Sequence, residues 1–343
     1  MTRLVGSVQA LASIGHLGPA PEAGYHGPPP FTLVTAVTQW KLDLPSILFV
    51  ALVGTLYYLA VHRLTARGGS WARGRKIAFG TGLGLIVFFS VSFFGAYADT
   101  LFWARAAQVI TLLMLTPLCL AMGAPVALAL ETLSERGAGR IRKVVASKAA
   151  RVISFPASGS VLLIATPWAF YFTGWYPAVL TNGVIDAVSR LALLVVGFVY
   201  FYSRLQLDPV PHKYPHLISV VITFVEVIFD AALGLVLWLS PHIVAHDYYQ
   251  ALGRSWGPSL RNDQIIGAGI LWIAGDAAGL PFLGALMRRM SVDDDKEAAE
   301  IDRELDEQDK AALETPDEGQ PAPTTSALWW ENDPVLAERF RHD

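Results

Sequence analysis

Apolar stretches about twenty residues long recur along this chain, separated by shorter polar segments. Each is close to the ~20 residues that a helix needs to cross the hydrocarbon core of a bilayer. We therefore predict an all-α, polytopic membrane protein with a bundle of seven transmembrane helices. The predicted spans are residues 44–62, 77–98, 101–130, 152–175, 183–203, 215–240 and 264–288.

Prolines make the third and fourth predicted spans irregular. The third is long and contains Pro117 and Pro125, which predict a kink or an interfacial end. The stretch 152–185 has no charged residue between its ends and must hold a crossing and a turn, which we expect near Gly174.

Basic residues in the short connections predict the orientation in the membrane. Cytoplasmic loops carry an excess of Lys and Arg. The first connection has five basic residues between Arg63 and Lys76, and the third has six between Arg136 and Arg151. The second holds only Asp99, and the fourth has no charge. This alternation predicts an N-terminus outside and a C-terminus in the cytoplasm.

The composition agrees with a membrane protein. Hydrophobic residues make up 53% of the chain, charged residues 16%, and the mean hydropathy is +0.42. Soluble domains carry about 25% charged residues, so we predict a multi-pass membrane protein. The single cysteine, Cys119, excludes an intrachain disulfide and a CxxC motif. No nucleophile and base are paired in the sequence, so we predict no enzymatic activity.

The charge distribution predicts three regions. Residues 1–37 are rich in Gly and Pro and lack the continuous apolar core of a signal peptide, which predicts a poorly ordered leader. Residues 38–290 form the predicted seven-helix transmembrane domain. From residue 291 to 343 the net charge is −12, against +9 for the preceding residues, which predicts an acidic cytoplasmic tail.

Charged side chains inside the apolar spans are the strongest indication of a site. A charge at the bilayer centre costs roughly 2.5–3.5 kcal/mol on insertion scales, so such residues pair or line a functional cavity. Asp186/Arg190 and Glu226/Asp230 are i,i+4 pairs, each on one helix face. Two interpretations stay open: ion pairs that hold the helices together, or a substrate, proton or ion pathway. The predicted outward-facing intramembrane pocket comprises Arg105, Gln108, Asp186, Arg190, Glu226, Asp230, Asp263 and Asp276.

Several short motifs resemble the CtaG-type cytochrome c oxidase assembly factors. The main one is residues 101–117, followed by Gly123-Ala124-Pro125. Further matches are Trp40-Lys41-Leu42-Asp43, Asp208-Pro209-Val210-Pro211, Asp263-Gln264, Trp272 and Gly275-Asp276. The resemblance covers roughly residues 38–310 and implies a seven-helix, multi-pass protein of the bacterial plasma membrane that assists oxidase assembly and handles copper.

The chain departs from this family at the histidines that the resemblance implies for copper. Arg105 and Val109 stand at a His-x-x-x-His pair, Asp186 and Arg190 at a similar pair, and Asp230 at a further histidine position. Arginine cannot coordinate copper, and carboxylates prefer harder cations. We therefore predict no metal and no cofactor here, and an ion-paired pocket in place of a metal-centred one.

The resulting prediction is a non-enzymatic membrane protein that assists oxidase assembly. Its expected partners are the lipid bilayer and oxidase subunits or other assembly factors, with no nucleic acid. The alternative is a transporter of small solutes, ions or protons that uses the same carboxylates and arginines. That alternative predicts that the charged path continues to the cytoplasmic side.

Overall fold

The computed structural model describes residues 25–148, 150, 155–205 and 216–314. Within these ranges the chain is helical and contains no strand. Its residue contacts divide it into two units, Met1–Met287 and Arg288–Asp343. The first holds all helices up to the beginning of the last one, and the second continues that last helix.

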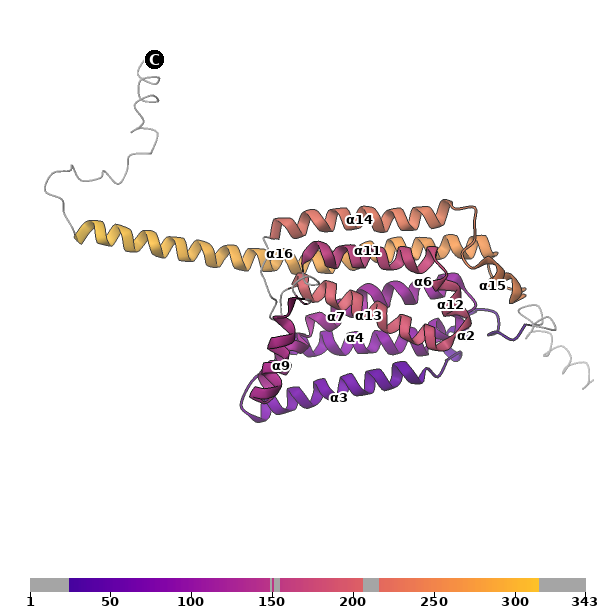
Figure 1. The fold of residues 1–343 in the computed structure, drawn as a ribbon, viewed down its shortest axis with the longest axis horizontal. Coiled ribbons are helices and arrows are strands. Elements are labelled where there is room, and N and C mark those ends of the chain that lie inside the picture. Colours follow the sequence, from indigo (N-terminus) through magenta and orange to yellow (C-terminus); the bar gives the residue numbers. More distant parts are fainter. Residues whose placement is uncertain (1–24, 149, 151–154, 206–215, 315–343) are drawn as a thin grey trace, which may run out of the picture. The chain divides into compact units, whose positions relative to one another are not determined.

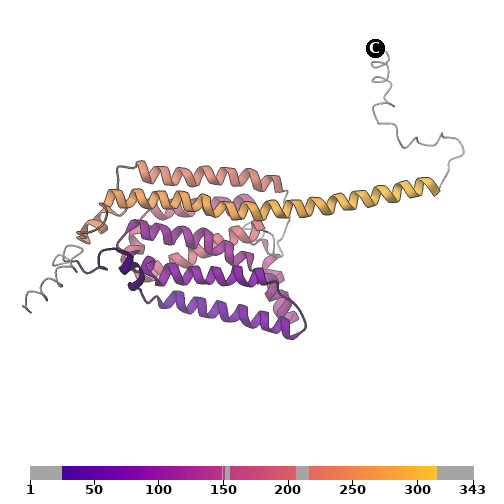
Figure 2. The same cartoon turned by 180° about the vertical axis from the view of Figure 1, so that it is seen from behind.

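The long helices of the first unit run side by side (Figures 1 and 2). Four segments are long and apolar enough to cross a membrane: Leu44–Ala66, Arg73–Tyr97, Phe102–Thr132 and Gly183–Leu205. They correspond to the first, second, third and fifth predicted spans. The fourth span coincides with the shorter apolar helix α11 (Pro156–Phe172), and the sixth and seventh with α14 (His216–Leu239) and the first part of α16 (Leu260–Glu314). That the chain crosses the membrane seven times, and in which orientation, remains a prediction.

Shorter helices divide and connect these segments. The second segment consists of α4 (Arg73–Val91) and α5 (Phe93–Tyr97), after α3 (Leu44–Ala66). The short helices outside the spans are α2 (Leu33–Thr38), α9 (Glu135–Val145), α12 (Trp175–Thr181) and α15 (His246–Ala251), and the fifth span is α13 (Gly183–Leu205).

The third segment is broken twice, near the two prolines that predicted an irregularity. It runs through α6 (Phe102–Ile110), the π-helical turn η1 (Thr111–Leu115), α7 (Thr116–Met122) and α8 (Pro125–Thr132). Pro117 has no N–H and its ring collides with the carbonyl four residues earlier, so the helix widens just before it. The second break lies at Ala124, whose φ of 47° is left-handed.

The core forms where α13 packs against this broken segment. Leu112, Leu113, Leu193 and Phe201 are buried there. Gly197 makes the close approach possible, because a Cβ at this position would lie 1.9 Å from the carbonyl oxygen of Leu113. Large apolar side chains on the outward faces of α3 and α13 are exposed, as expected for a surface that faces lipid.

The two ends of the bundle differ in the elements that cover them. We call the end where α3, α6, α13 and α16 begin the Asp99 end, and the end where α3 and α13 terminate the Arg204 end. Helices α2 and α15 lie at the Asp99 end, and α9 lies at the Arg204 end (Figures 1 and 2).

Part of the predicted leader is packed against the Asp99 end. Phe31 contacts the rings of Tyr97 and Trp103 with centroid distances of 5.5 and 5.3 Å. The Tyr97 hydroxyl donates to the carbonyl of Pro29 at 2.8 Å. The structure thus differs from the predicted poorly ordered leader over residues 25–37, and residues 1–24 lie outside the described residues.

The second unit is described up to residue 314. Its described part is the continuation of α16, and the described side chains from 295 to 307 are exposed. The remainder of the predicted acidic tail, 315–343, and the Asp208-Pro211 motif lie outside the described residues.

Candidate functional site

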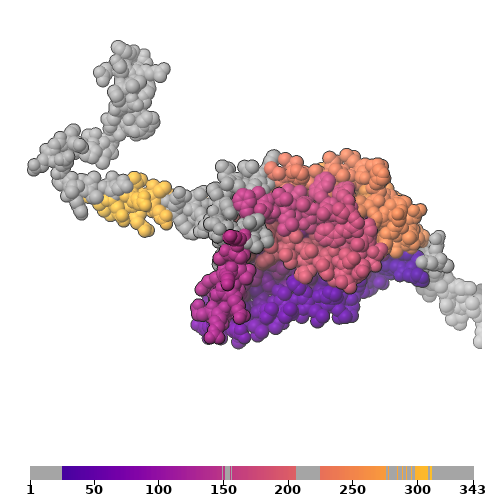
Figure 3. Space-filling view, in the orientation of Figure 1, coloured from indigo at the N-terminus to yellow at the C-terminus, as the bar shows by residue number. Residues whose placement is uncertain are grey.

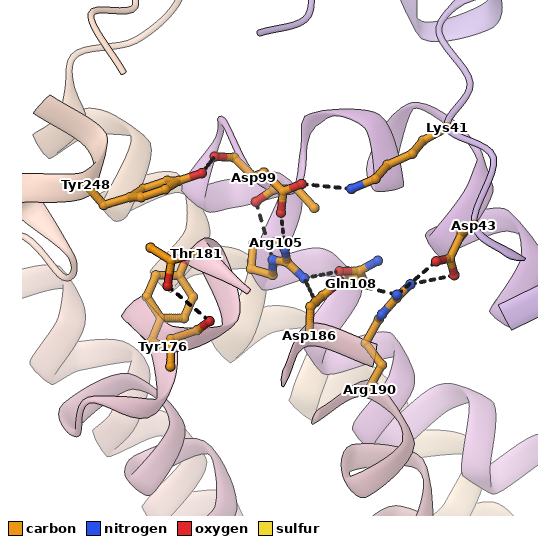
Figure 4. A network of polar contacts seen from close by, with 12 residues as sticks. Lys41, Asp43, Asp99, Arg105, Gln108, Tyr176, Thr181, Asp186, Arg190 and Tyr248 are labelled. Atoms are coloured by element: carbon orange, nitrogen blue, oxygen red, sulfur yellow. Dashed lines mark hydrogen bonds and ion pairs between the residues drawn. The ribbon is translucent and has the colours of Figure 1, made fainter. Parts of the chain in front are cut away.

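A chain of ion pairs crosses the Asp99 end of the bundle, and Arg105 lies at its centre (Figure 4). Arg105 lies on α6 with 2% of its surface exposed. Its guanidinium donates to the carboxylate of Asp186 on α13 at 2.6 Å and forms a very short contact with Asp99. It also donates to the side chain of Gln108 at 2.9 Å and to the carbonyl of Ala98 at 3.3 Å. Every nitrogen of this buried side chain therefore has an acceptor.

Arg190 extends the network from α13 to the beginning of α3. It forms a two-pronged pair with the carboxylate of Asp43 at 2.7 and 3.0 Å. It also lies 3.2 Å from Asp186, one helical turn before it. Asp43 is the N-cap of α3 and accepts from the backbone N–H of Ser46 at 3.3 Å. The Asp43–Arg190 pair thus joins the beginning of α3 to α13.

Lys41 adds the outermost cation. Its ammonium group lies 2.8 Å from Asp99, and its backbone N–H donates to Val91. The order of charged groups is therefore Lys41, Asp99, Arg105, Asp186, Arg190 and Asp43, which alternates in sign. Three cations face three carboxylates, so the network is formally neutral.

The carboxylates outside the spans respond to these neighbours. Burial alone raises the pKa of Asp99, but the charges of Arg105 and Lys41 outweigh it and lower the pKa below its ordinary value. Burial also raises the pKa of Asp43, and hydrogen bonds from Arg190 and Ser46 reverse that shift. Both groups are therefore held in the ionised form that the network requires.

Two neutral side chains complete the network. Gln108 accepts from Arg105 with its side-chain oxygen and donates to the carbonyl of Phe89 on α4 at 2.9 Å. The Tyr248 hydroxyl, on α15, donates to the backbone carbonyl of Asp99 at 3.0 Å. The network is thus fixed to the neighbouring helices by uncharged hydrogen bonds as well as by charge.

Asp263 has a different role at the same end. Its two carboxylate oxygens accept from the backbone N–H groups of Phe102 at 3.1 Å and Trp103 at 3.0 Å. Helix α6 begins without a side-chain cap of its own. Asp263, from the first turn of α16, therefore supplies the acceptor and the negative charge that the N-terminus of α6 lacks.

Glu226 does not join this network. Its carboxylate accepts from Arg204 at 2.8 Å and from the Tyr200 hydroxyl at 2.5 Å, and Arg204 also donates to Ser160 at 2.7 Å. Arg204 and Glu226 are both buried. The predicted fifth span ends at residue 203, just before Arg204, whereas the structure shows Arg204 in the last turn of α13, inside the bundle.

Asp230, on α14, lies beside α16. A Cβ at Gly275 on α16 would lie 4.0 Å from the Asp230 carboxylate. Asp230 also lines a cavity of about 10 Å³ together with Ile110, Met114 and six other apolar residues. Asp276 lies in α16, but its side chain is outside the described ones. Of the eight predicted pocket residues, the structure brings together Arg105, Gln108, Asp186 and Arg190.

Sequence reasoning missed Lys41, Asp43 and Asp99 as members of the site. All three lie just outside predicted spans, where charged residues are common and carry little information. The eight predicted pocket residues include two arginines and five carboxylates, and this excess of three negative charges could have prompted a search for nearby cations such as Lys41. It could not have revealed Asp43 and Asp99, because each adds another negative charge.

The side chains of this network are not suited to coordinate copper. Two guanidinium groups and an ammonium group occupy its centre and edge, and they cannot coordinate a metal ion. Each of the three carboxylates lies against two donors or cations. Among the described residues, no group of three His, Cys, Asp or Glu side chains is arranged to hold a metal.

The chain is similar in sequence to longer mycobacterial proteins. The chain is 27% identical over 290 residues to an uncharacterised protein of Mycobacterium leprae, and 29% identical over 292 residues to one of Mycobacterium bovis. Each alignment covers 82% of this chain and 44% of the relative, so the chain spans less than half the length of these curated relatives.

A family match agrees with the motifs found in the sequence. No solved structure matches the chain. The family described as cytochrome c oxidase caa3 assembly factor matches residues 55–292, from α3 to the middle of α16. Lys41 and Asp43 precede the matched region, whereas the other members of the ion-pair network fall within it. With a match over more than half of its length, this chain belongs to the Caa3_CtaG family of cytochrome c oxidase caa3 assembly factors.

Proposed function

We propose that this protein assists the assembly of cytochrome c oxidase in the bacterial plasma membrane without handling copper at its buried polar site. The observation that carries the proposal is the family match over residues 55–292 on a bundle whose polar centre is an ion-paired network. In this proposal Arg105, Asp186 and Arg190 hold α6, α13 and α3 in one arrangement. The assembled surface then binds an oxidase subunit or another assembly factor, and no chemical step is required.

The arrangement of charges supports a structural role of this network. Arg105 donates four of its five N–H groups within the protein, to the carboxylates of two different segments and to two uncharged acceptors. A buried ion pair is weak evidence for stability, but it can fix which partners meet. We propose that the network sets the relative positions of the helices that form the binding surface.

Transport is not favoured by the distribution of charge. The alternative requires a polar path through the bundle. Between Arg190 and Tyr200, α13 has nine consecutive apolar residues, a rise of about 15 Å between the two polar positions. Leu193 and Leu194 in this stretch are buried. The Arg204–Glu226 pair therefore forms a separate polar cluster, and we do not propose a relay that joins the two.

The test is the reduced-minus-oxidised haem spectrum of membranes from a strain that lacks this protein. We expect the a-type oxidase signal to fall and to return when the wild-type chain is re-expressed. An unchanged signal in the deletion strain would overturn the assembly role. Immunoblots for an oxidase subunit distinguish failed assembly from reduced synthesis.

Added copper and matched variants separate metal handling from assembly. If the role is independent of copper, excess copper in the medium leaves the deletion phenotype unchanged, whereas restoration by copper would contradict this part of the proposal. Arg105→Met should fail to restore the signal. Arg142→Met is the matched control, because Arg142 is exposed and far from the Asp99 end, on α9.

A further inference from the structure

Helix α9 crosses the Arg204 end of the bundle instead of running along it. In Figure 1 it lies across the direction of the long helices, and Figure 3 shows its magenta surface at that end of the molecule. It follows α8 closely, since the C-cap of α8 is Leu133 and the N-cap of α9 is Ser134. Where the long helices cross a bilayer, a helix in this position lies along the membrane surface.

The two faces of α9 differ in polarity. Arg136, Arg140 and Lys143 are exposed, and their i, i+4 and i+7 spacing places them on one face. The opposite face carries Ala138, which is buried, and Ile141, which is half-buried. A helix with Lys and Arg on one face and apolar residues on the other is typical of helices that lie at a bilayer surface.

The cations of this face lack partners in the protein. Within the described part of the chain, Arg136, Arg140 and Lys143 make no ion pair and no side-chain hydrogen bond, whereas Arg142 lies 3.9 Å from Glu135. At the Asp99 end, by contrast, each cation of the ion-pair network faces a carboxylate. Like charges that are gathered without partners repel one another. Anions from outside the bundle would remove this repulsion.

The connection between α3 and α4 adds further cations beside α9. Arg67 donates to the carbonyl of Thr132, at the end of α8, at 3.4 Å. Residues 63–76 and 131–148 together contain ten basic and two acidic side chains. We call the exposed cations of these two connections the basic surface: Arg63, Arg67, Arg73, Lys76, Arg136, Arg140, Lys143 and Lys148.

Apolar side chains beside these cations indicate which anion fits. Val144 directly follows Lys143 and is 68% exposed, and Ile77 directly follows Lys76 and is also 68% exposed. Leu133, just before α9, is 41% exposed. An acidic peptide would neutralise the cations alone. The boundary between headgroups and acyl chains offers phosphate to the cations and hydrocarbon to their apolar neighbours.

We propose that the basic surface binds the headgroup phosphates of anionic phospholipids, with α9 lying in the headgroup region and Val144 in contact with acyl chains. Lys and Arg near an anionic leaflet are attracted to it, and the attraction falls off within a Debye length. With the predicted orientation, this leaflet is the cytoplasmic one. The inference does not depend on the role in oxidase assembly, because it concerns only how the bundle meets the bilayer.

The test compares two lipids that differ only in the charge of the headgroup. The purified full-length protein, freed of lipid in detergent, is given phosphatidylglycerol or phosphatidylcholine with the same oleoyl chains. Native mass spectrometry measures how much of each remains bound. We expect phosphatidylglycerol to be retained about tenfold better at low salt, and the preference to shrink at high salt because exposed charges are screened. Equal retention of the two lipids at low salt overturns the proposal.

Two double variants separate the basic surface from the net charge of the protein. Arg140→Gln combined with Lys143→Gln changes α9, and Arg303→Gln combined with Lys310→Gln changes the continuation of α16. All four side chains are exposed, and each pair removes one arginine and one lysine. The α9 variant should lower the preference about threefold or more, and the α16 variant should keep it. An equal loss in both would assign the preference to net charge and overturn the proposal.

Fluorescence quenching tests the position of α9 without removing a charge. In a Cys119→Ala background, Val144→Cys and Gly139→Cys carry an environment-sensitive dye on different faces of the helix. Gly139 is the matched control, because it is exposed and nothing lies within 4 Å of its Cβ position. In phosphatidylglycerol nanodiscs, a nitroxide on the upper acyl chain should quench the dye at Val144→Cys more strongly. Quenching no stronger there than at Gly139→Cys would contradict the contact with acyl chains.

A soluble polyglutamate peptide tests the other source of negative charge. We expect it to leave most of the bound phosphatidylglycerol in place, because it offers nothing to Val144 and Ile77. If the peptide instead displaces the lipid from the wild-type protein, and fails to bind the Arg140→Gln and Lys143→Gln double variant, the basic surface is a docking site for an acidic protein segment. The assignment to phospholipid is then wrong.

Discussion

Arg105 is a buried cation, and its contribution to stability depends on the charged groups around it. Removing one partner of a buried pair leaves an unpaired charge, whereas replacing the whole pair by apolar groups is often neutral. The alternation of sign from Lys41 to Asp43 means that each interior member has two neighbours of opposite charge. The network therefore acts as a unit, and single substitutions and double substitutions should differ.

Replacing Arg105 alone should be strongly destabilising. Arg105→Met removes the central cation, and Asp99 and Asp186 then retain only Lys41 and Arg190. Each carboxylate keeps one cation. We therefore expect the free energy of unfolding to fall by about 3 kcal/mol, the lower end of the range for broken buried ion pairs. Denaturant unfolding of the purified protein in one fixed detergent measures it.

The double variant tests whether the cost comes from the unpaired charge. Asp186→Asn combined with Arg105→Met removes one cation and one anion, so it should lose clearly less stability than the sum of the two single variants. Strict additivity would show that the two side chains act independently, which is incompatible with the 2.6 Å contact between them.

Acid should weaken the network at its two outer carboxylates. The folded-state pKa values of Asp43 and Asp99 lie below their ordinary values. Their contribution is therefore complete above the unfolded-state pKa, about 3.9, and is lost as the pH falls through the lower folded-state values. We expect Tm to be flat from pH 7 to 5 and to fall below about pH 4.

Asn substitutions at these positions identify the titrating groups. Asp43→Asn combined with Asp99→Asn should lower Tm at pH 7 and reduce its dependence on pH below 4, because the groups that take up protons are absent. A double variant with the acid dependence of the wild type would assign that dependence to other carboxylates.

The sequence revealed part of the network and could not reveal the rest. Arg105, Asp186 and Arg190 are conspicuous because charge inside an apolar span is costly. Asp43 and Asp99 are ordinary in sequence, since a cap and a connecting turn commonly hold such residues. Glu226 and Asp230 are one helical turn apart, but Glu226 binds Arg204, and only the packing of α13 against its neighbours shows this.

At the scale of elements, the contact between α13 and the π-helical turn is the most demanding in the bundle. Gly197 faces the carbonyl of Leu113 and the ring of Pro117, and an added Cβ would lie 1.9 and 2.6 Å from them. The sequence predicts an irregularity from Pro117 but gives no sign of which glycine accommodates it. Only the packed structure, in which Gly197 contacts the widened turn, identifies that glycine.

Gly197→Ala should therefore lower stability even though alanine favours helices. The added methyl group forces two packed elements apart, which costs about 1–3 kcal/mol or more. Gly84→Ala on α4 is the matched control, because nothing lies within 4 Å of its Cβ position, and it should be neutral or slightly stabilising. Thermal unfolding of the two variants beside the wild type measures the difference. Equal Tm values for both would show that α13 can shift without cost.

At the scale of the whole molecule, the ion pairs that α13 makes with other described residues form two clusters. One contains Arg105 and Asp186, and the other contains Arg204 and Glu226, with the apolar middle of α13 between Arg190 and Tyr200. Each cluster joins helices that are distant in sequence. This arrangement suits a rigid helical body that presents a surface to a partner, and it agrees with membership of an assembly-factor family.

The orientation of the chain is a prediction that single cysteines can test. In a Cys119→Ala background, Ser70→Cys probes the connection after α3, Asp247→Cys probes α15, and Ser291→Cys probes the residues after the predicted seventh span. All three positions are exposed. With an N-terminus outside and seven crossings, a membrane-impermeant maleimide added to intact cells labels Asp247→Cys alone. Labelling of the other two requires opened cells.

The pattern of labelling distinguishes the ways in which this topology can fail. If Ser70→Cys and Ser291→Cys react in intact cells and Asp247→Cys does not, the bundle is inverted, and the basic connections do not set its orientation. If Asp247→Cys and Ser291→Cys react from the same side, α16 does not cross the membrane. The Asp99 end would then keep its ion pairs, because those contacts come from α3, α6 and α13. The side of the Asp99 end that α16 covers in the structure would then face lipid. Asp263 would cap α6 from a helix that lies outside the bilayer core.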